Sequence, residues 1–295
     1  MQKNLGRGSA FNLKVKLWPI FANFMTKKFI DIEKIIADKN PKLLKRLPTF
    51  IINYLKRILW QDEVNRIIQD NEGVSGVQFC RNVIKEFNIT ASIEGIENAP
   101  KTGGVTFASN HPLGGMDALA FIDQFSHYRS DIKFIANDIL LNLKPMQDIF
   151  VGVNKMGATA VPSLKNVDSV LANDESVVIF PAGLVSRRKN GVIEDLEWKK
   201  TFVTRARKHN VPIVPVIIDG KLSNFFYNLS NLREKLGIQA NIEMLYLVNE
   251  LFKQKNTTIK IIFGKPIYPK DLDNDLKDTV LAQDIKRKAY SLKSK

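Results

Sequence analysis

Short runs of β-branched and apolar residues alternate with helical patterns over most of this chain, and no other feature constrains its fold as strongly. Such runs occur at residues 91–94, 105–109, 132–136, 159–161, 177–180, 213–218 and 259–263. Apolar residues at helical spacing lie between most of them. Strands separated by helices predict an α/β fold, with a mixed, largely parallel sheet flanked by helices on both faces.

The chain before the first of these strands has a different pattern. From residue 30 to about residue 87 the apolar positions follow helical spacing, which predicts three or four short amphipathic helices. We therefore divide the chain into a basic amphipathic helical region, residues 1–88, and an α/β domain, residues 89–295. Residues 60–87 also suit ordinary helices that pack against a core.

The positive charge is concentrated at the amino end. The chain has 44 Lys and Arg against 30 Asp and Glu, a net charge of +14. Residues 1–60 contain thirteen basic and three acidic residues, so they contribute +10 of this charge. Aromatic residues and lysines are mixed over residues 11–30, a combination that suits the headgroup region of an anionic membrane. We expect residues 1–88 to include a membrane-surface anchor.

Several features of the sequence bear on location and partners. No stretch reaches the roughly 18 uncharged apolar residues of a membrane-spanning helix, and no secretory signal pattern is present. The single cysteine, Cys80, suits a reducing compartment and a small core residue. We expect a cytoplasmic protein, peripheral on the inner face of the cell membrane. Nucleic acid is not an expected partner, because no helix-turn-helix, zinc-finger or ribonucleoprotein pattern occurs.

A candidate catalytic site follows the predicted strand at 105–109. Asn110 and His111 come directly after it, and five residues, including a proline and two glycines, separate His111 from Asp117. On a continuous helix the two side chains would point about 240° apart, so they can meet only across a turn. A histidine steadied by a carboxylate can accept a proton from an alcohol or amine. The same residues also suit a buried strand-end histidine with Asp117 capping the next helix.

A second candidate follows the predicted strand at 177–180. Pro181, Ala182 and Gly183 form a turn sequence, and Arg187 and Arg188 come shortly after it. A glycine here lets backbone N–H groups approach an oxyanion or a headgroup, and arginine binds phosphate or carboxylate in a fork geometry. A simple turn with exposed arginines explains the same residues without any ligand.

Together these stretches resemble the glycerolipid and lysophospholipid acyltransferase family, 1-acylglycerol-3-phosphate acyltransferases among them, over roughly residues 90–270. The matching residues are, in chain order, Asn110, His111 and Asp117 for the His-x4-Asp block, Gly152 and Lys155 for a glycine and an acceptor-binding basic residue, Phe180, Pro181 and Gly183 for the Phe-Pro-Glu-Gly block, and residues 211–216 for the final Val-Pro-Ile-Val-Pro-Val strand. Four blocks in the family's order are hard to obtain by chance.

Three departures narrow the resemblance. The spacing of five residues between histidine and aspartate, instead of four, is similar to a hemolysin-like, aminolipid branch of the family. Ala182 replaces the usual glutamate, and Val185 replaces an arginine that contacts the acceptor phosphate in glycerol-phosphate enzymes. Either Arg187 takes over that contact, or the acceptor carries a carboxylate, as in the bacterial glycine and ornithine lipids attributed to this branch.

The resemblance implies a lipid acyltransferase. It would move a fatty acyl group from acyl-ACP or acyl-CoA to a hydroxyl or amine of a lysophospholipid, glycerol phosphate or amino-acid lipid. The expected partners are acyl carrier protein or a coenzyme A thioester, a lipid acceptor and an anionic membrane surface. No cofactor beyond the acyl thioester is expected, and no metal, because His111, His127 and His209 form no ligand-like cluster in the sequence.

Each candidate residue then has an expected role. His111 is the general base, and Asp117 orients its ring and stabilises the imidazolium. Backbone N–H groups near Gly183, together with Asn110, stabilise the oxyanion. The candidate ligands of the acceptor headgroup are Lys155, Arg187 and Arg188, and an apolar channel should receive the acyl chain.

Two other functions fit parts of the sequence. A serine lipid hydrolase could use Ser186 or Ser109 as nucleophile, but the Gly-x-Ser-x-Gly pattern of a nucleophile elbow is absent. A non-catalytic protein could bind membranes through the basic surface alone. Such a protein would have no need for a histidine and a carboxylate at one strand end.

Overall fold

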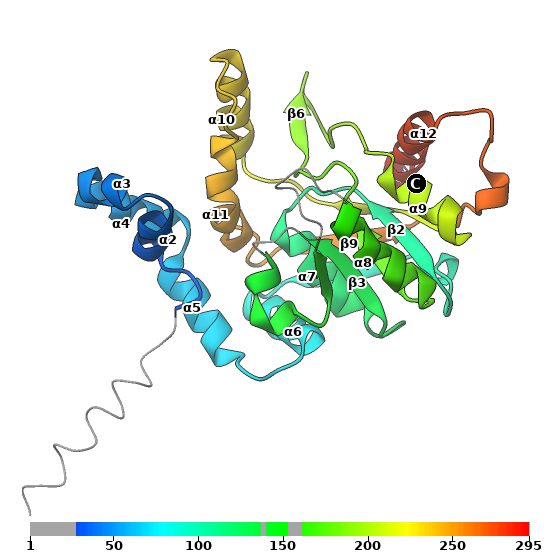
Figure 1. The fold of residues 1–295 in the computed structure, drawn as a ribbon, viewed down its shortest axis with the longest axis horizontal. Coiled ribbons are helices and arrows are strands. Elements are labelled where there is room, and N and C mark those ends of the chain that lie inside the picture. The colour runs from blue at the N-terminus through cyan, green and yellow to red at the C-terminus, as the bar shows by residue number, and fades with distance from the viewer. Residues whose placement is uncertain (1–27, 137–139, 153–160, 295) are drawn as a thin grey trace, which may run out of the picture.

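The computed structural model describes residues 28–136, 140–152 and 161–294 (Figure 1). Its centre is a seven-stranded sheet with the order β1-β9-β8-β2-β5-β3-β4. The strands are β1 Thr90–Glu94, β2 Val105–Ser109, β3 Ile132–Ala136, β4 Phe150–Gly152, β5 Ser176–Ile179, β8 Ile213–Asp219 and β9 Thr258–Phe263. β8 and β9 pair antiparallel, and the other neighbouring pairs of this sheet are parallel. The predicted mixed, largely parallel α/β sheet is confirmed.

Helices cover both faces of the sheet and form two hydrophobic cores with it. Helices α6 Gly76–Glu86 and α7 Gly115–Phe125 contribute to the first core. Helices α8 Val161–Ala172, α9 Thr201–His209 and α12 Asp278–Ser291 contribute to the second. Adjacent residues of β2 point into opposite cores, as alternation along a strand requires. β2 is therefore buried on both faces, Thr106 and Ser109 included.

The amino-terminal helices differ in how deeply they are buried. They are α2 Ile32–Lys39, α3 Pro41–Arg46, α4 Thr49–Ile58 and α5 Gln61–Asp70, followed by α6. Phe79, Cys80, Val83 and Phe87, from α6 and its carboxyl end, belong to the first core, so this part of residues 60–87 packs as core-facing helix. Burial raises the pKa of the Cys80 thiol, as the predicted core position requires. By contrast, α3 has no buried residue.

Two further elements flank the strand ends that carry the sequence motifs. The first is a hairpin of β6 Arg187–Lys189 and β7 Val192–Glu194. The second, which we call the arm, is residues 224–252 and contains α10 Asn224–Lys235, the 3-10 helix η4 Ile242–Tyr246 and α11 Leu247–Phe252. In Figure 1 the arm stands as a column at the edge of the sheet domain. The other 3-10 helices are Ile96–Asn98, Leu140–Asn142, Lys144–Met146, Pro269–Asp271 and Leu292–Ser294.

The sequence missed some short elements. β4 and the β6–β7 hairpin were not predicted, because each strand has only three residues. Of the strand predicted at 159–161, residues 159 and 160 lie outside the described residues, and Val161 begins α8 instead. The membrane-surface segment predicted at residues 11–30 lies almost entirely outside the described residues. Within the part of the chain described here, no helix has the length and apolar character needed to cross a bilayer.

Candidate active site

The two sequence motifs meet at one edge of the sheet. β2 pairs in parallel with β5 on one side and with β8 on the other, so the carboxyl ends of the three strands lie together. Asn110 and His111 follow β2, and Phe180 follows β5. Residues after the carboxyl ends of adjacent parallel strands are where ligands bind in folds of this class. The sheet therefore brings together motifs that are far apart in the sequence.

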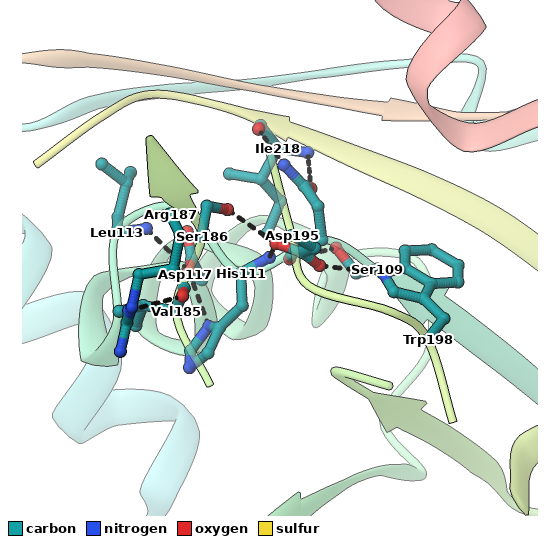
Figure 2. Close-up of polar contacts among 11 residues, drawn as sticks. Ser109, His111, Leu113, Asp117, Val185, Ser186, Arg187, Asp195, Trp198 and Ile218 are labelled. Carbon is teal, nitrogen blue, oxygen red and sulfur yellow. Dashed lines mark hydrogen bonds and ion pairs between the residues drawn. The ribbon is translucent and has the colours of Figure 1, made fainter. Parts of the chain in front are cut away.

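A tight turn brings His111 and Asp117 into contact (Figure 2). The His111 Nδ1 atom lies 2.8 Å from Asp117 Oδ2. Gly114, at φ +68°, adopts a conformation that other residues rarely accept, and it directly precedes α7, whose first turn contains Asp117. The Asp117 N–H donates to the Gly114 carbonyl at 3.0 Å. The predicted turn, and the approach of the two side chains that it allows, are confirmed.

The carboxylate of Asp117 is fully buried and only partly satisfied. Its Oδ2 atom also accepts a hydrogen bond from the Leu113 N–H at 2.9 Å, while Oδ1 has no partner among the described residues. Burial raises the pKa of Asp117, and the hydrogen bond with His111 opposes this shift. When Asp117 is ionised its oxygens only accept hydrogen bonds, so in that state His111 Nδ1 is the donor of this contact and Nε2 is the ring nitrogen with a free lone pair. This tautomer can accept a proton at Nε2.

Phe180 covers one face of the His111 ring. The two rings are stacked, with centroids 4.0 Å apart and an angle of 15° between their planes. The His111 side chain is nevertheless 20% exposed. The ring is therefore held between a carboxylate at one edge and an aromatic face, and it still reaches solvent. Phe180 was predicted as part of the second motif, but its contact with His111 was not.

Asp195 is a further polar residue at this site, and no sequence motif indicated it. Its Oδ1 atom accepts hydrogen bonds from the His111 N–H at 3.2 Å and from the Ser186 hydroxyl at 2.6 Å, and Oδ2 accepts one from Trp198 Nε1 at 2.9 Å. The Ser186 N–H in turn donates to the His111 carbonyl at 2.9 Å. His111, Ser186 and Asp195 thus form a closed ring of hydrogen bonds that holds the backbone at His111 in place (Figure 2).

The position of Asp195 explains why sequence patterns could not reveal it. It follows the β6–β7 hairpin and lies 84 positions after His111. Its own backbone is held by α12, because its N–H donates to the Tyr290 hydroxyl and its carbonyl accepts from Lys286 Nζ. Asp195 is buried, and an aspartate outside any motif gives no signal of burial in the sequence.

Asn110 and Gly183, the two candidates for oxyanion stabilisation, both have structural contacts. Asn110 is buried, its Nδ2 donates to the Ile218 carbonyl, and its Oδ1 accepts from the Ile218 N–H. This fastens the end of β2 to β8 and corrects the expectation that the Asn110 amide faces an oxyanion. Gly183, at φ +69°, donates its N–H to the Phe180 carbonyl at 2.9 Å. Its turn is the one that the sequence predicted.

Arg187 does not face solvent as an acceptor ligand would. Its guanidinium is buried, donates to the Val185 carbonyl at 2.8 Å, and forms an ion pair with Glu243 at 2.9 Å. Glu243, on η4, is also buried and pairs with Arg233 of α10 at 2.9 Å. Burial lowers the pKa of Arg187, and the charge of Glu243 opposes this shift. Arg187 therefore joins the second motif to the arm, which corrects its expected place as an exposed headgroup ligand.

Of the other two expected headgroup ligands, Arg188 and Lys155, only Arg188 is among the described residues. Arg188 is partly exposed, donates to the side-chain oxygens of Asn224 and Asn228, and lies over the ring of Tyr227. It is positioned by α10 at the side of the site. Lys155 lies outside the described residues.

Neither candidate serine nucleophile is directed at His111. Ser109 is buried, and its hydroxyl donates to the Asn110 carbonyl at 3.0 Å. Ser186 is buried, and its hydroxyl donates to Asp195. A nucleophilic serine must instead donate to the histidine that activates it. The geometry therefore gives no support to a serine hydrolase.

The remaining histidines lie in separate surroundings. His127 is beside Arg81, and His209 forms an ion pair with Asp168 at 2.9 Å. Among the described residues, no group of three or more His, Cys, Asp or Glu side chains is arranged to hold a metal ion.

Comparisons with known proteins place the chain in a family. A family model described as "Acyltransferase" matches residues 34–295. A lyso-glycine lipid O-acyltransferase of Bacteroides thetaiotaomicron is 41% identical over 264 residues, covering 89% of this chain and 97% of that protein. A lyso-glycine lipid O-acyltransferase of Phocaeicola vulgatus is 41% identical over 265 residues, with 89% and 95% covered.

One similar crystal structure is that of the 1-acyl-sn-glycerophosphate acyltransferase PlsC from Thermotoga maritima, with a TM-score of 0.49, 19% identity, and 83% of this chain and 90% of that chain covered. The family model spans most of the chain, and the two curated relatives are matched along nearly their whole length. The predicted family is confirmed: this chain belongs to the acyltransferase family and is a lipid acyltransferase.

Proposed function

We propose that this enzyme transfers a fatty acyl group from a thioester, acyl-ACP or acyl-CoA, to a hydroxyl of a lyso-glycine lipid, with His111 as general base. The observation that carries this proposal is the His111–Asp117 pair, with Nδ1 and Oδ2 2.8 Å apart and the ring still exposed to solvent. Support for the acceptor comes from the two relatives, which share 41% identity with the chain and are named for it.

His111 would act through Nε2. The acceptor hydroxyl attacks the thioester carbonyl carbon while Nε2 takes its proton, and the imidazolium then returns that proton to the leaving thiolate. Asp117 stabilises the imidazolium through the Nδ1–H hydrogen bond. Such general-base catalysis contributes about 10²- to 10⁴-fold in rate. No protein residue needs to be acylated, so donor and acceptor react directly.

The tetrahedral intermediate needs donors for its oxyanion. In our proposal these are backbone N–H groups near Gly183 in the turn that follows Phe180, other than the Gly183 N–H itself, which donates to the Phe180 carbonyl. Each such donor is worth about 2.7–4 kcal/mol of transition-state stabilisation. Asn110 contributes by fastening the end of β2 in place, and not by contact with the oxyanion.

The acceptor headgroup would be bound as a carboxylate. Val185 occupies the place of the phosphate-binding arginine, and Arg187 is engaged with Glu243, so the second motif offers less positive charge than a phosphate site requires. We assign headgroup binding to Arg188, which is partly exposed, and to Lys155 by resemblance. A single carboxylate needs fewer cationic partners than a phosphate does.

The enzyme would work at the cytoplasmic face of the cell membrane. Residues 39–60 contain six Lys or Arg and no Asp or Glu, and several of the basic residues in α3 are exposed. This stretch would bring the sheet domain to an anionic bilayer that holds both acceptor and product.

The test is a purified assay with an acyl-CoA or acyl-ACP and a lyso-glycine lipid, with the diacylated product identified by mass. We expect product from the wild-type protein and almost none from His111→Ala. His127→Ala is the matched control, because it removes an imidazole outside the site and should leave turnover unchanged. Equal product from His111→Ala and wild type would overturn the proposed base, and product only from a lysophospholipid would overturn the proposed acceptor.

A further inference from the structure

The arm presents an apolar stripe to solvent. Phe225, Leu229 and Leu232 follow one another along α10 at helical spacing, and Leu236 continues the series directly after its end, so the four lie on one face; Leu229 is half-buried. Phe225 is 48% exposed, Leu232 53% and Leu236 64%. An α-helix on the surface of a soluble domain normally turns such a face toward the core. In α10 the opposite side, with Phe226 and Tyr227, fills that role.

This stripe continues onto the amino-terminal helices. The Phe225 ring packs against that of Tyr246 with centroids 4.9 Å apart, and the Tyr246 hydroxyl shares a hydrogen bond of 2.5 Å with the hydroxyl of Tyr54 on α4. One helical turn before Tyr54 on α4 lies Phe50, which is 72% exposed. The exposed Phe225 at the start of α10 is thus connected to α4 through two tyrosines.

The distribution of exposed apolar residues sets this surface apart. In the described residues, most of the large exposed apolar side chains fall within two segments, 35–60 and 225–245. Scattered single residues of this kind are normal on any protein, but a contiguous patch marks an interaction surface. The two segments are distant in sequence and are brought together by the fold.

The arm also contacts residues 110–117, which we call the catalytic turn. Leu247 of α11 lies close to Gly114, and Leu251 lies so close to Gly115 that a Cβ atom there would approach it to 3.0 Å. The buried ion pairs of Glu243 with Arg187 and Arg233 join η4 and α10 of the arm to the start of β6. Whatever contacts the outer face of the arm is therefore held at a fixed place relative to His111.

The charge around this surface identifies its occupant. Residues 39–60, which contain α3 and α4, carry six basic residues and no acidic one. Exposed apolar side chains beside a segment rich in Lys and Arg, with tyrosines between the two, match the interface of an anionic bilayer, where acyl chains lie below negatively charged headgroups. A protein partner would have to bring its own acidic groups to face these basic residues, and no feature of the described residues favours such a protein over a bilayer.

We propose that α10, through the apolar stripe Phe225, Leu229, Leu232 and Leu236, inserts into the same bilayer that α3 and α4 contact, and so sets the orientation of the catalytic turn toward lipid. This deepens the proposed function, on which it rests, because it names the surface that meets the membrane holding the acceptor. The membrane contact then has two elements on either side of Tyr54 and Tyr246, one mainly basic and one mainly apolar.

The test compares Leu232→Asp/Leu236→Asp with Val280→Asp in the full-length protein. Val280 is a matched control because it is 45% exposed, on α12 in the other core layer. Binding is measured by flotation with vesicles of phosphatidylethanolamine and phosphatidylglycerol. Because both substitutions remove apolar area from the proposed bilayer contact, we expect the double variant to bind at least about tenfold more weakly, and the control to bind as wild type does. Acylation of a lyso-glycine lipid embedded in the vesicles should fall with binding.

Several outcomes would overturn the proposal. Wild-type flotation by the double variant would show that the stripe does not meet lipid. Loss of a dimer in size-exclusion chromatography, with flotation unchanged, would show that the stripe binds a second copy of the chain instead. The single variant Leu236→Ser, checked by its unfolding temperature, repeats the test if the double variant folds poorly. Flotation does not depend on turnover, so absence of turnover in the wild type would count against the proposed function alone.

Discussion

The catalytic turn and the arm touch each other, yet their surfaces are built in opposite ways. In and around the turn, polar groups are buried and almost all of them are paired. Asp195 accepts three hydrogen bonds, and Asp117 contacts both the His111 ring and the Leu113 N–H. In the arm, apolar groups are exposed and have no covering element in the described residues. The turn is therefore shaped by directional contacts, and the outer face of the arm by none.

This difference suits two different tasks. Proton transfer requires atoms held within a fraction of an ångström, and buried hydrogen bonds can provide that. Contact with a fluid bilayer requires apolar area at the right place and no fixed partner. The buried ion pairs of Glu243 with Arg187 and Arg233 connect the two regions. If the comparison is right, substitutions in the turn should change the rate constant of the reaction, and substitutions in the arm and amino-terminal helices should change membrane affinity.

The largest effect is expected from His111→Ala. Loss of the base should lower kcat by about 10²- to 10⁴-fold, while vesicle binding stays at the wild-type level. The measurement is kcat at saturating acceptor, paired with flotation of the same protein sample. A variant that lost flotation together with kcat would break the separation between the two regions.

A smaller loss is expected from Asp117→Asn, because the base remains but its charge-assisted hydrogen bond is weakened. Such bonds are worth about 1.5–3 kcal/mol, which corresponds to roughly 10- to 10²-fold in kcat. The KM for the acceptor should change little, since Asp117 is buried and faces the ring. A change confined to KM would show that Asp117 serves binding and not orientation of the base.

The same variant has an expected signature in stability. Burial raises the pKa of Asp117, so the folded protein binds this proton more tightly than the unfolded chain does. The ionised carboxylate therefore costs stability as the pH rises through the pKa of the folded state, and this cost is absent at acid pH, where both states are protonated. The unfolding temperature of Asp117→Asn should accordingly rise relative to wild type between acid and neutral pH. A difference that did not vary with pH would contradict the assignment.

Asp195→Asn should sharpen the comparison by testing a residue that only positions the turn. The amide would replace one acceptor with a donor and oppose either Trp198 Nε1 or the donors from His111 and Ser186. We expect about a tenfold fall in kcat with little change in KM, in line with the loss of a buried hydrogen bond. Asp195→Glu should recover less activity than the wild type but more than Asp195→Ala. Equal kcat in all three variants would leave Asp195 with a purely structural role.

Much of the sheet and of the catalytic turn could be predicted from the sequence, because the deciding signals are local. Six of the seven sheet strands were expected, apart from their exact ends, because buried strands are rich in apolar residues; β4 was not expected. His111 and Asp117 were expected to meet because Pro112 and two glycines between them permit only a turn. In these cases the deciding interactions lie within a few residues of one another.

The contacts that could not be predicted are those made across long distances in the sequence. Asp195 reaches His111 only because the β6–β7 hairpin folds back, and three-residue strands give no clear periodicity. Arg187 was expected at the surface, and it is buried because Glu243, more than fifty positions later, pairs with it. The local sequence near Arg187 contains no trace of that partner.

The smallest expected effect concerns the basic side of the membrane surface. Lys45 is exposed on α3, and a lysine near an anionic bilayer contributes about 1 kcal/mol, so Lys45→Ala should weaken flotation with phosphatidylglycerol-containing vesicles by roughly fivefold. Binding to vesicles of phosphatidylcholine alone should not change, and raising the salt concentration should reduce the difference between variant and wild type. The weaker flotation of Leu232→Asp/Leu236→Asp should persist at high salt, because salt does not screen an apolar contact. If both variants responded to salt in the same way, the arm and the amino-terminal helices would not differ as the comparison requires.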